Sequence, residues 1–152
     1  MQIQKVHELR MATLLDSIKS SDLKEEVPVA CAIYDSKNQL ITVQRNEVEK
    51  NTDSTSHAEI LAIKKASQIN FHPNLDGYSL YVTLEPCIMC LGAILNSNIK
   101  KVIFGAYSDQ THERTLLLDF FRQNYQKIEI IGGVLEKECQ DLLASWFKSI
   151  RS

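Results

Sequence analysis

The sequence predicts a three-layer α/β/α fold, in which a five-stranded mixed sheet carries helices on both faces. Apolar residues recur along the chain alternately at helical spacing and in short strand-like runs. The first two strand-like runs are separated only by turn-forming residues, which is typical of a β-hairpin. Helical segments separate the later runs, which favours parallel strands joined by right-handed crossovers. With 152 residues, of which 44% are hydrophobic and 24% charged, the chain is expected to form one domain over residues 1–152.

The N-terminal part is predicted to contain a helix and the hairpin. Five apolar residues at helical spacing predict a helix that ends near the polar residues 20–22: Val6, Met11, Leu14, Leu15 and Ile18. The runs 27–34 and 40–43 flank a turn-rich segment and predict the two strands of the hairpin. Pro28 indicates that the first strand either lies at an edge of the sheet or begins at that point.

The rest of the chain continues the alternation of helices and strands. Residues 46–56 are almost wholly polar, so we expect a loop that leads to a helix beginning around Ser56 and His57. The remaining expected elements, in chain order, are a strand at 78–83, a helix at 87–96, a strand at 101–104, a helix at 116–123, a strand at 128–134 and a helix at 136–150.

The last of these helices carries two aromatic residues, Trp146 and Phe147. An exposed aromatic ring can stack on a nucleic-acid base. Their helical spacing with Leu142 and Leu143 favours the other interpretation, which is packing in the hydrophobic core. We therefore expect both rings to be core residues.

Two short motifs carry residues suited to metal chemistry. His57 and Glu59 stand in the first motif, and Cys87 and Cys90 stand in the second. His57, Cys87 and Cys90 supply three zinc ligands, whereas a structural zinc site is normally closed by four protein ligands. Three ligands leave a coordination position for water, so the pattern predicts one Zn²⁺ per chain in a hydrolytic site. Glu59 need not be a ligand and is predicted to move protons between the water and the substrate.

The spacing of the second motif fits one face of a helix. Cys87 and Cys90 are three positions apart, so both thiols can reach one metal ion if a helix begins at Pro86. Proline suits the first helical position because the N–H that it lacks would have no partner there. The positive end of the helix dipole favours thiolates over thiols, and thiolates are what a metal ion needs.

Two other interpretations of the cysteines are possible. A lone CxxC can be a thioredoxin-like redox pair, but such a pair needs no HxE partner. A structural zinc would need a fourth ligand, and none of the candidates lies at ligand spacing from another: Cys31, Cys139, His7, His72 and His112. We expect Cys31 and Cys139 to be buried small hydrophobic residues in a reducing compartment.

Charge and hydropathy limit the possible partners. The formal net charge of −2 and the isoelectric point near 6.1 exclude a global positive field, so any contact with nucleic acid has to be local. No apolar run approaches the length of a membrane span, and the N-terminal residues lack the apolar stretch of a signal peptide. These features predict a cytoplasmic protein without a membrane partner.

The pattern H-x-E followed by P-C-x-x-C is the signature of zinc-dependent nucleobase deaminases. Over nearly its whole length the chain resembles the bacterial tRNA-specific adenosine deaminases of the cytidine deaminase-like superfamily. The stretches that carry the resemblance are residues 27–30, Asn46, residues 53–60, 80–90 and 102–106, and residues 132–135 with the helix that follows.

The resemblance implies the cytidine deaminase-like fold and a hydrolase that acts on the C–N bond of an amidine. It also implies a homodimer, a tRNA anticodon stem-loop as partner, and conversion of adenosine to inosine at the wobble position. Carried over by position, it makes His57, Cys87 and Cys90 the zinc ligands, Glu59 the proton shuttle and Asn46 the side chain that holds the flipped nucleoside. Two further substrate contacts are predicted at Ala58 and Pro86.

The chain departs from the pattern of these relatives in three places. Ser54 and Ser56 stand where Pro and Ala are usual, and residues 107–114 replace the usual Arg-Asp and Lys-Thr-Gly-rich loop. The basic C-terminal tail is also short, which leaves fewer cations for phosphate groups. These differences leave open a deaminase of free bases or nucleosides, of the guanine or cytosine type. A non-catalytic subunit that only presents RNA is a third hypothesis, and Glu59 argues against it because a scaffold does not need a proton shuttle.

Overall fold

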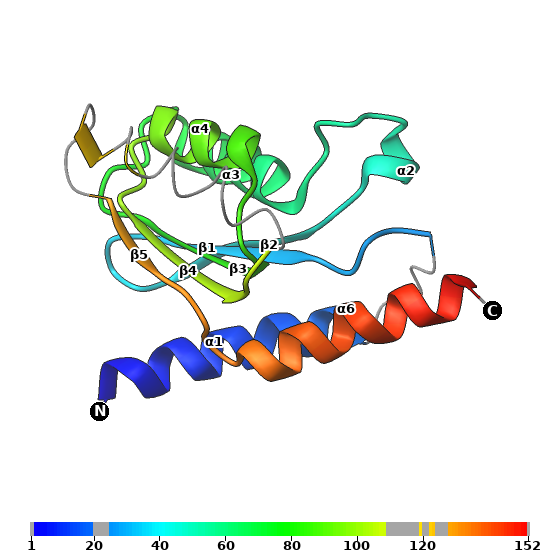
Figure 1. Cartoon of the computed structure of the whole chain (residues 1–152). Helices are drawn as coiled ribbons and strands as arrows, with labels where there is room; N and C mark the ends of the chain where they lie inside the picture. The colour runs from blue at the N-terminus through cyan, green and yellow to red at the C-terminus, as the bar shows by residue number, and fades with distance from the viewer. Residues whose placement is uncertain (1, 20–24, 109–118, 120–121, 124–127, 152) are drawn as a thin grey trace.

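A mixed sheet of five strands forms the middle layer of the molecule (Figure 1). The computed structural model describes residues 2–19, 25–108, 119, 122–123 and 128–151. The strands are β1 (Ala30–Tyr34), β2 (Leu40–Arg45), β3 (Ser79–Leu84), β4 (Lys101–Ala106) and β5 (Glu129–Ile131). Their order is β2-β1-β3-β4-β5, with β1 antiparallel to both of its neighbours and the β3–β4 and β4–β5 pairs parallel. The predicted hairpin and the parallel later strands are confirmed.

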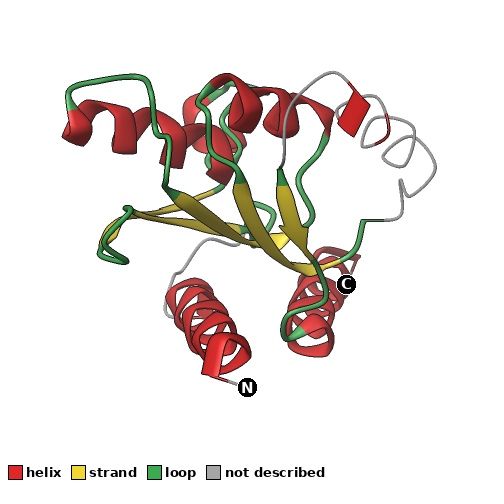
Figure 2. Ribbon diagram, turned by 90° about the vertical axis from the view of Figure 1, so that its left-hand side faces the viewer, coloured by secondary structure: helices red, strands yellow, loops and turns green. Residues whose placement is uncertain are grey.

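Helices cover both faces of the sheet, as the sequence predicted. Within the described residues, the helices with defined bounds are α1 (Gln2–Lys19), α2 (Val48–Asn51), α3 (Ala58–Asn70), α4 (Ile88–Asn96) and α6 (Glu136–Arg151). Viewed along the helices, α1 and α6 lie side by side beneath the sheet, while α3 and α4 lie above it (Figure 2). None of the helices in the described part of the chain is both long and apolar enough to cross a membrane.

The two faces of the sheet bury two hydrophobic clusters. Alternate residues of β1 contribute to each one, with Cys31 and Ile33 facing α3 and α4, and Ala30 and Ala32 facing α1 and α6. All five residues of β1 are buried, which is expected for an internal strand covered on both sides. The sheet is therefore a fixed platform for the loops and helix ends that follow its strands.

Pro28 lies just before the first residue of the internal strand β1, so of its two predicted positions the start of a strand is confirmed and the edge is not. Two other local predictions need correction. Helix α2 lies within residues 46–56, where a loop was expected, because its first turn is capped by a side chain from a distant segment. Helix α4 begins at Ile88 with Cys87 as its N-cap, so Pro86 is not the first helical residue. The predicted helix at 116–123 falls largely outside the described residues.

Candidate metal centre and active-site cavity

The ends of two helices bring the predicted zinc ligands together. His57 is the N-cap residue of α3, Cys87 is the N-cap residue of α4, and Cys90 lies in the first turn of α4. Neither N-cap side chain makes a capping hydrogen bond to its own helix, so the imidazole and the thiol are available to a metal ion. The chain thus places the ligands where two positive helix ends favour thiolates.

The distances between these side chains fit a zinc ion. The Nδ1 atom of His57 lies 3.7 Å from Sγ of Cys87 and 3.6 Å from Sγ of Cys90. A tetrahedral zinc ion with bonds of roughly 2.05 Å to nitrogen and roughly 2.3 Å to sulfur holds such atoms roughly 3.6 Å apart. Among the described residues, the group of side chains close enough to share a metal ion is His57, Cys87 and Cys90. No fourth protein ligand, as a structural site would have, joins this group from the residues that the structure describes.

The two thiols share their protons unequally. A hydrogen bond with Cys90 lowers the pKa of Cys87 to about 5. The same hydrogen bond and burial raise the pKa of Cys90 above its ordinary value. Cys87 is therefore the thiolate before any metal binds, and metal binding has to displace the proton of Cys90.

Glu59 lies in the first turn of α3, beside the ligands but outside the metal group. Its side chain lines the same cavity as His57 and Cys87, and the residue is only 4% exposed. Burial raises the pKa of Glu59, and a hydrogen bond from Cys90 and the charge of His57 partly oppose this shift. A raised pKa makes the carboxylate a stronger base, which suits a group that has to take a proton from water.

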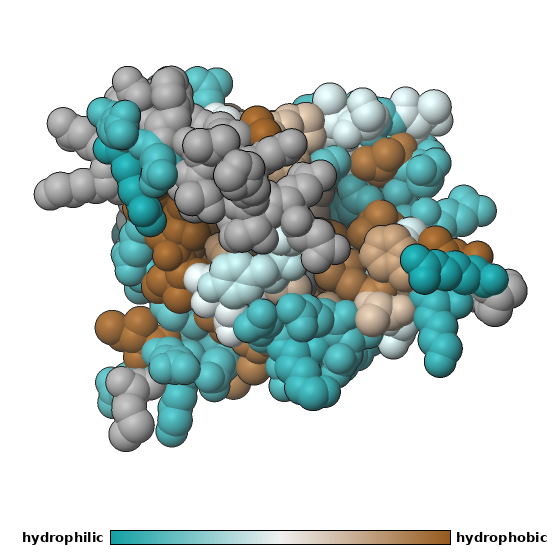
Figure 3. Space-filling view, in the orientation of Figure 1, coloured by the Kyte–Doolittle hydropathy of each residue, from teal (hydrophilic) through white to brown (hydrophobic). Residues whose placement is uncertain are grey.

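The cavity over the site has a volume of about 830 Å³. Its walls come from the segment before β1, the residues around α2, the two helix ends that carry the ligands, the residues after β4, and α6. Apolar side chains are exposed between α2 and the C-terminal half of α6, on the right-hand side of the space-filling view (Figure 3). Val27, Val48 and Phe147 are among the apolar residues that line the cavity.

The charged groups of the lining are acidic. The described residues that line the cavity include five carboxylates and no Lys or Arg: Glu25, Glu26, Glu49, Glu59 and Glu85. Glu85 is buried, and one of its carboxylate oxygens accepts a hydrogen bond of 2.8 Å from the backbone N–H of Ser108. This bond fixes the start of the divergent segment 107–114, of which Tyr107 and Ser108 are described and both line the cavity.

Of the three predicted substrate contacts, Asn46 and Ala58 line the cavity and Pro86 does not. Asn46 lines the cavity and is 7% exposed, and its backbone N–H donates to the carbonyl of Val29 at 3.0 Å. Within the described part of the chain, its side-chain amide has no hydrogen-bond partner, so the amide is available to a ligand. Ala58 also lines the cavity. Pro86 is buried and is not part of the lining.

Helix α6 supplies a wall of the cavity that sequence reasoning missed. Gln140, Leu143, Trp146 and Phe147 line it, so the prediction that both aromatic rings pack in the core is wrong. Phe147 is 44% exposed, and Trp146 is half-buried with its ring edge-on to Phe147 at 5.0 Å between centroids. Consecutive residues of a helix point in different directions, so at most one of the two could have faced the core. The adjacency of Trp146 and Phe147 in the sequence could therefore have shown that one of them lies outside the core.

The other cysteines behave as expected. Cys31 and Cys139 are free and buried, and burial raises the pKa of both thiols, which makes them unreactive. His7 is held on the opposite side of the sheet, where its Nδ1 lies 2.7 Å from the hydroxyl oxygen of Tyr81. His112 lies outside the described residues. Within the described part of the chain, none of the other candidates joins the metal group.

Comparison with known sequences identifies relatives of the chain. A family model for the cytidine and deoxycytidylate deaminase zinc-binding region matches residues 4–106. The chain is 35% identical to the tRNA-specific adenosine deaminase of Bacillus subtilis over 147 residues, which cover 95% of this chain and 90% of that protein. It is 40% identical to the tRNA-specific adenosine deaminase of Buchnera aphidicola over 135 residues, which cover 88% of this chain and 83% of that protein.

Solved structures with the same fold include deaminases that act on different substrates. One comes from a study of A-to-I editing by tRNA deaminases at the wobble position of transfer RNA. It has a TM-score of 0.77 and 29% identity, and it covers 87% of this chain and 96% of that one. The guanine deaminase of Bacillus subtilis has a TM-score of 0.61 and 29% identity, and it covers 81% of this chain and 76% of that one.

Proposed function

Because the chain belongs to the zinc-dependent cytidine and deoxycytidylate deaminase family, we propose that it converts adenosine to inosine at the wobble position of a tRNA anticodon loop. The observation that carries this proposal is the full-length similarity to tRNA-specific adenosine deaminases. The cavity of about 830 Å³ over the candidate zinc site offers room for a nucleoside. Bases of an anticodon loop are already unpaired, so one of them can enter such a cavity at little cost.

The proposed mechanism assigns metal binding and proton transfer to different residues. His57, Cys87 and Cys90 would hold a zinc ion, which would supply an activated water by lowering the pKa of that water to roughly 7. Glu59 accepts a proton from the attacking water and delivers it to the ring nitrogen next to C6 of adenine. A second transfer through Glu59 protonates the amino group, which leaves as ammonia, so that adenosine and water give inosine and ammonia.

Asn46 and Ala58 are proposed to position the nucleoside. An Asn side chain offers two N–H donors and a carbonyl acceptor, which suits the edge of a base or a ribose hydroxyl. Ala58 lies between the ligand His57 and the proton shuttle Glu59, so its small side chain lets a planar base approach both. Pro86 stays a prediction as a substrate contact.

Deamination of a free base such as guanine is a second candidate function, and two observations favour it. The described lining of the cavity carries carboxylates and no Lys or Arg, and phosphate groups of RNA are normally bound by cations. The structural similarity to guanine deaminase also favours a free base as the substrate. The full-length similarity to tRNA deaminases ranks the RNA substrate first.

Three further properties are proposals, of which the homodimer comes from the resemblance and the other two from length, composition and hydropathy. The protein is a single domain over residues 1–152, forms a homodimer and acts in the cytoplasm, where its tRNA substrate is modified. Light scattering coupled to size-exclusion chromatography tests the dimer, and a mass equal to one chain would contradict it.

One assay separates the two candidate substrates. Zinc-loaded protein is incubated with a tRNA that carries adenosine at the first anticodon position and, in parallel, with free adenosine, guanine, cytosine and cytidine, and inosine and ammonia are measured. We expect inosine in the tRNA alone, with binding that weakens only gently as salt increases, because few cations are available to displace counterions. Turnover of a free base without reaction on tRNA would overturn the proposal in favour of the second candidate.

A further inference from the structure

Glu26 is a buried carboxylate that the proposed chemistry does not use. It is 4% exposed and lies just before β1, in the segment that lines the active-site cavity. It also lines a second, smaller cavity of about 290 Å³, which shares Asn46 and Trp146 with the active-site cavity. A buried charge is costly unless it is hydrogen-bonded, so its partners identify its role.

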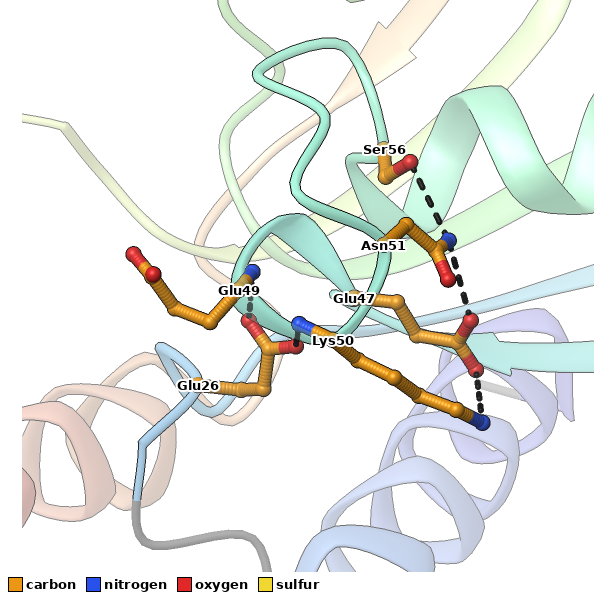
Figure 4. Close-up of polar contacts among 6 residues, drawn as sticks. All are labelled: Glu26, Glu47, Glu49, Lys50, Asn51 and Ser56. Atoms are coloured by element: carbon orange, nitrogen blue, oxygen red, sulfur yellow. Dashed lines mark hydrogen bonds and ion pairs between the residues drawn. The ribbon is translucent and has the colours of Figure 1, made fainter.

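The partners of Glu26 are backbone groups of α2. One carboxylate oxygen accepts from the N–H of Glu49 at 2.9 Å, and the other accepts from the N–H of Lys50 at 3.0 Å. These N–H groups belong to the first turn of the helix, where no intrahelical acceptor exists. The helix's own N-cap residue, Glu47, makes no side-chain capping bond. Glu26 therefore caps α2 from a distant position in the sequence, as Figure 4 shows.

The capped helix belongs to the loop that joins two residues of the site. Asn46 precedes this loop and His57 follows it, and the N–H of Glu47 donates to the carbonyl of Ser56 at 3.0 Å across its base. The backbone N–H of Asn46 is bonded to Val29, in the same segment as Glu26. Segment 26–29 thus holds Asn46 through the backbone of Val29 and α2 through the side chain of Glu26. A substitution can remove the bonds made by a side chain but not a bond between backbone groups, so Glu26 is the residue to test.

We infer that Glu26 is a positioning residue, whose carboxylate holds α2 and thereby places Asn46 at the wall of the substrate cavity. It acts through the backbone of α2 and not on the reacting atoms. The inference rests on the proposed function in one respect only, which is that Asn46 binds substrate. The metal ligands are held independently by the ends of α3 and α4, so loss of Glu26 leaves zinc in place.

A double-mutant cycle tests this role. Glu26→Ala, Asn46→Ala and the double variant are compared by kcat/KM on whichever substrate the wild type converts. We expect Glu26→Ala to lower kcat/KM by about tenfold to a hundredfold, the loss expected when a binding group is displaced, with zinc content unchanged. If Glu26 acts through Asn46, the double variant is about as slow as Asn46→Ala alone. Losses that multiply in the double variant would overturn the inference.

A second measurement does not depend on turnover. Hydrogen exchange of the backbone amides of Glu49 and Lys50 should become faster in Glu26→Ala and partly faster in Glu26→Gln, since an amide side chain has a single oxygen acceptor. Glu138→Gln, which removes an exposed carboxylate on α6, is the matched control and should exchange as the wild type does. Unchanged exchange in both Glu26 variants would refute the capping role, whatever substrate the enzyme uses. If Glu26→Ala fails to fold, Glu26→Gln carries both tests.

Discussion

Asn46 and Glu59 line the same cavity, although one follows strand β2 and the other lies in the first turn of α3. The loop between them is closed at its base by the hydrogen bond from Glu47 to Ser56. The proposed substrate amide and the proposed proton shuttle are therefore fixed relative to one another by backbone bonds. Substrate binding, proton transfer and metal binding are assigned to different residues, so substitutions can test them separately.

The metal centre gives the first prediction. Cys87→Ala should lose most of the bound zinc and unfold at a lower temperature, because the free energy of metal binding adds to that of folding. Metal analysis of purified protein, with thermal unfolding monitored in parallel, measures both effects. Cys31→Ala removes a buried thiol outside the metal group and should keep its zinc. Full zinc occupancy in Cys87→Ala would show that the assigned ligands are wrong.

The proton shuttle gives the second prediction. Glu59→Gln keeps the size and burial of the side chain but removes its ability to accept a proton. We expect turnover to fall by on the order of a hundredfold to ten-thousandfold, as for other general acid–base residues, while zinc content stays at the wild-type level. Retained turnover would disprove the assigned role and would revive the hypothesis of a subunit that only presents RNA.

Sequence reasoning succeeded where the decisive relationships are local. Helices and strands follow from hydrophobic spacing within a few residues, and the hairpin and the parallel later strands follow from the short turn and the helical crossovers. The grouping of His57, Cys87 and Cys90 could be predicted because these candidate ligands stand in short motifs. The structure differs only by placing Cys87 at an N-cap, one residue before the helix.

Sequence reasoning failed where contacts join distant segments. Helix α2 was predicted as loop because its residues are polar, and nothing nearby shows that Glu26 supplies its cap. The aromatic pair of α6 was assigned to the core, because helical spacing shows which residues share a face but not what that face meets. The cavity wall formed by Trp146 depends on how α6 lies against the sheet, and this is a property of the whole fold.

Cys139 gives a prediction for alkaline pH. The residue is 1% exposed, and burial raises the pKa of its thiol from the ordinary 9.0 to about 11. A raised pKa in the folded state means that the protonated thiol stabilises the fold below about pH 9, and that this contribution is lost as the pH rises from about 9 to about 11. A shift of this size corresponds to roughly 2 to 3 kcal/mol.

Denaturant unfolding between about pH 8 and about pH 11 measures this effect. Cys139→Ala should be less stable than the wild type at neutral pH, because the smaller side chain leaves a cavity beside β4. Its free energy of unfolding should fall less steeply with pH than that of the wild type. The buried Cys31 and Tyr81, whose pKa values are also raised by burial, contribute equally to both proteins. Parallel pH profiles for the two proteins would rule out the assigned effect of Cys139.

Trp146 gives a prediction that separates a substrate-binding wall from a core residue. If its ring stacks on a base of the substrate, Trp146→Ala should raise KM by roughly fivefold to 150-fold, the equivalent of about 1 to 3 kcal/mol of stacking, with a smaller change in kcat. A core tryptophan would behave differently, since its replacement by Ala costs about 3 to 5 kcal/mol of folding free energy. Phe71→Ala, which removes an aromatic ring that is 95% exposed and outside the cavity, should leave KM unchanged. Steady-state kinetics and denaturant unfolding of both variants therefore decide the matter. A large loss of folding stability without a change in KM would show that Trp146 acts as a core residue. A raised KM in a stable protein would indicate that its ring contacts the substrate.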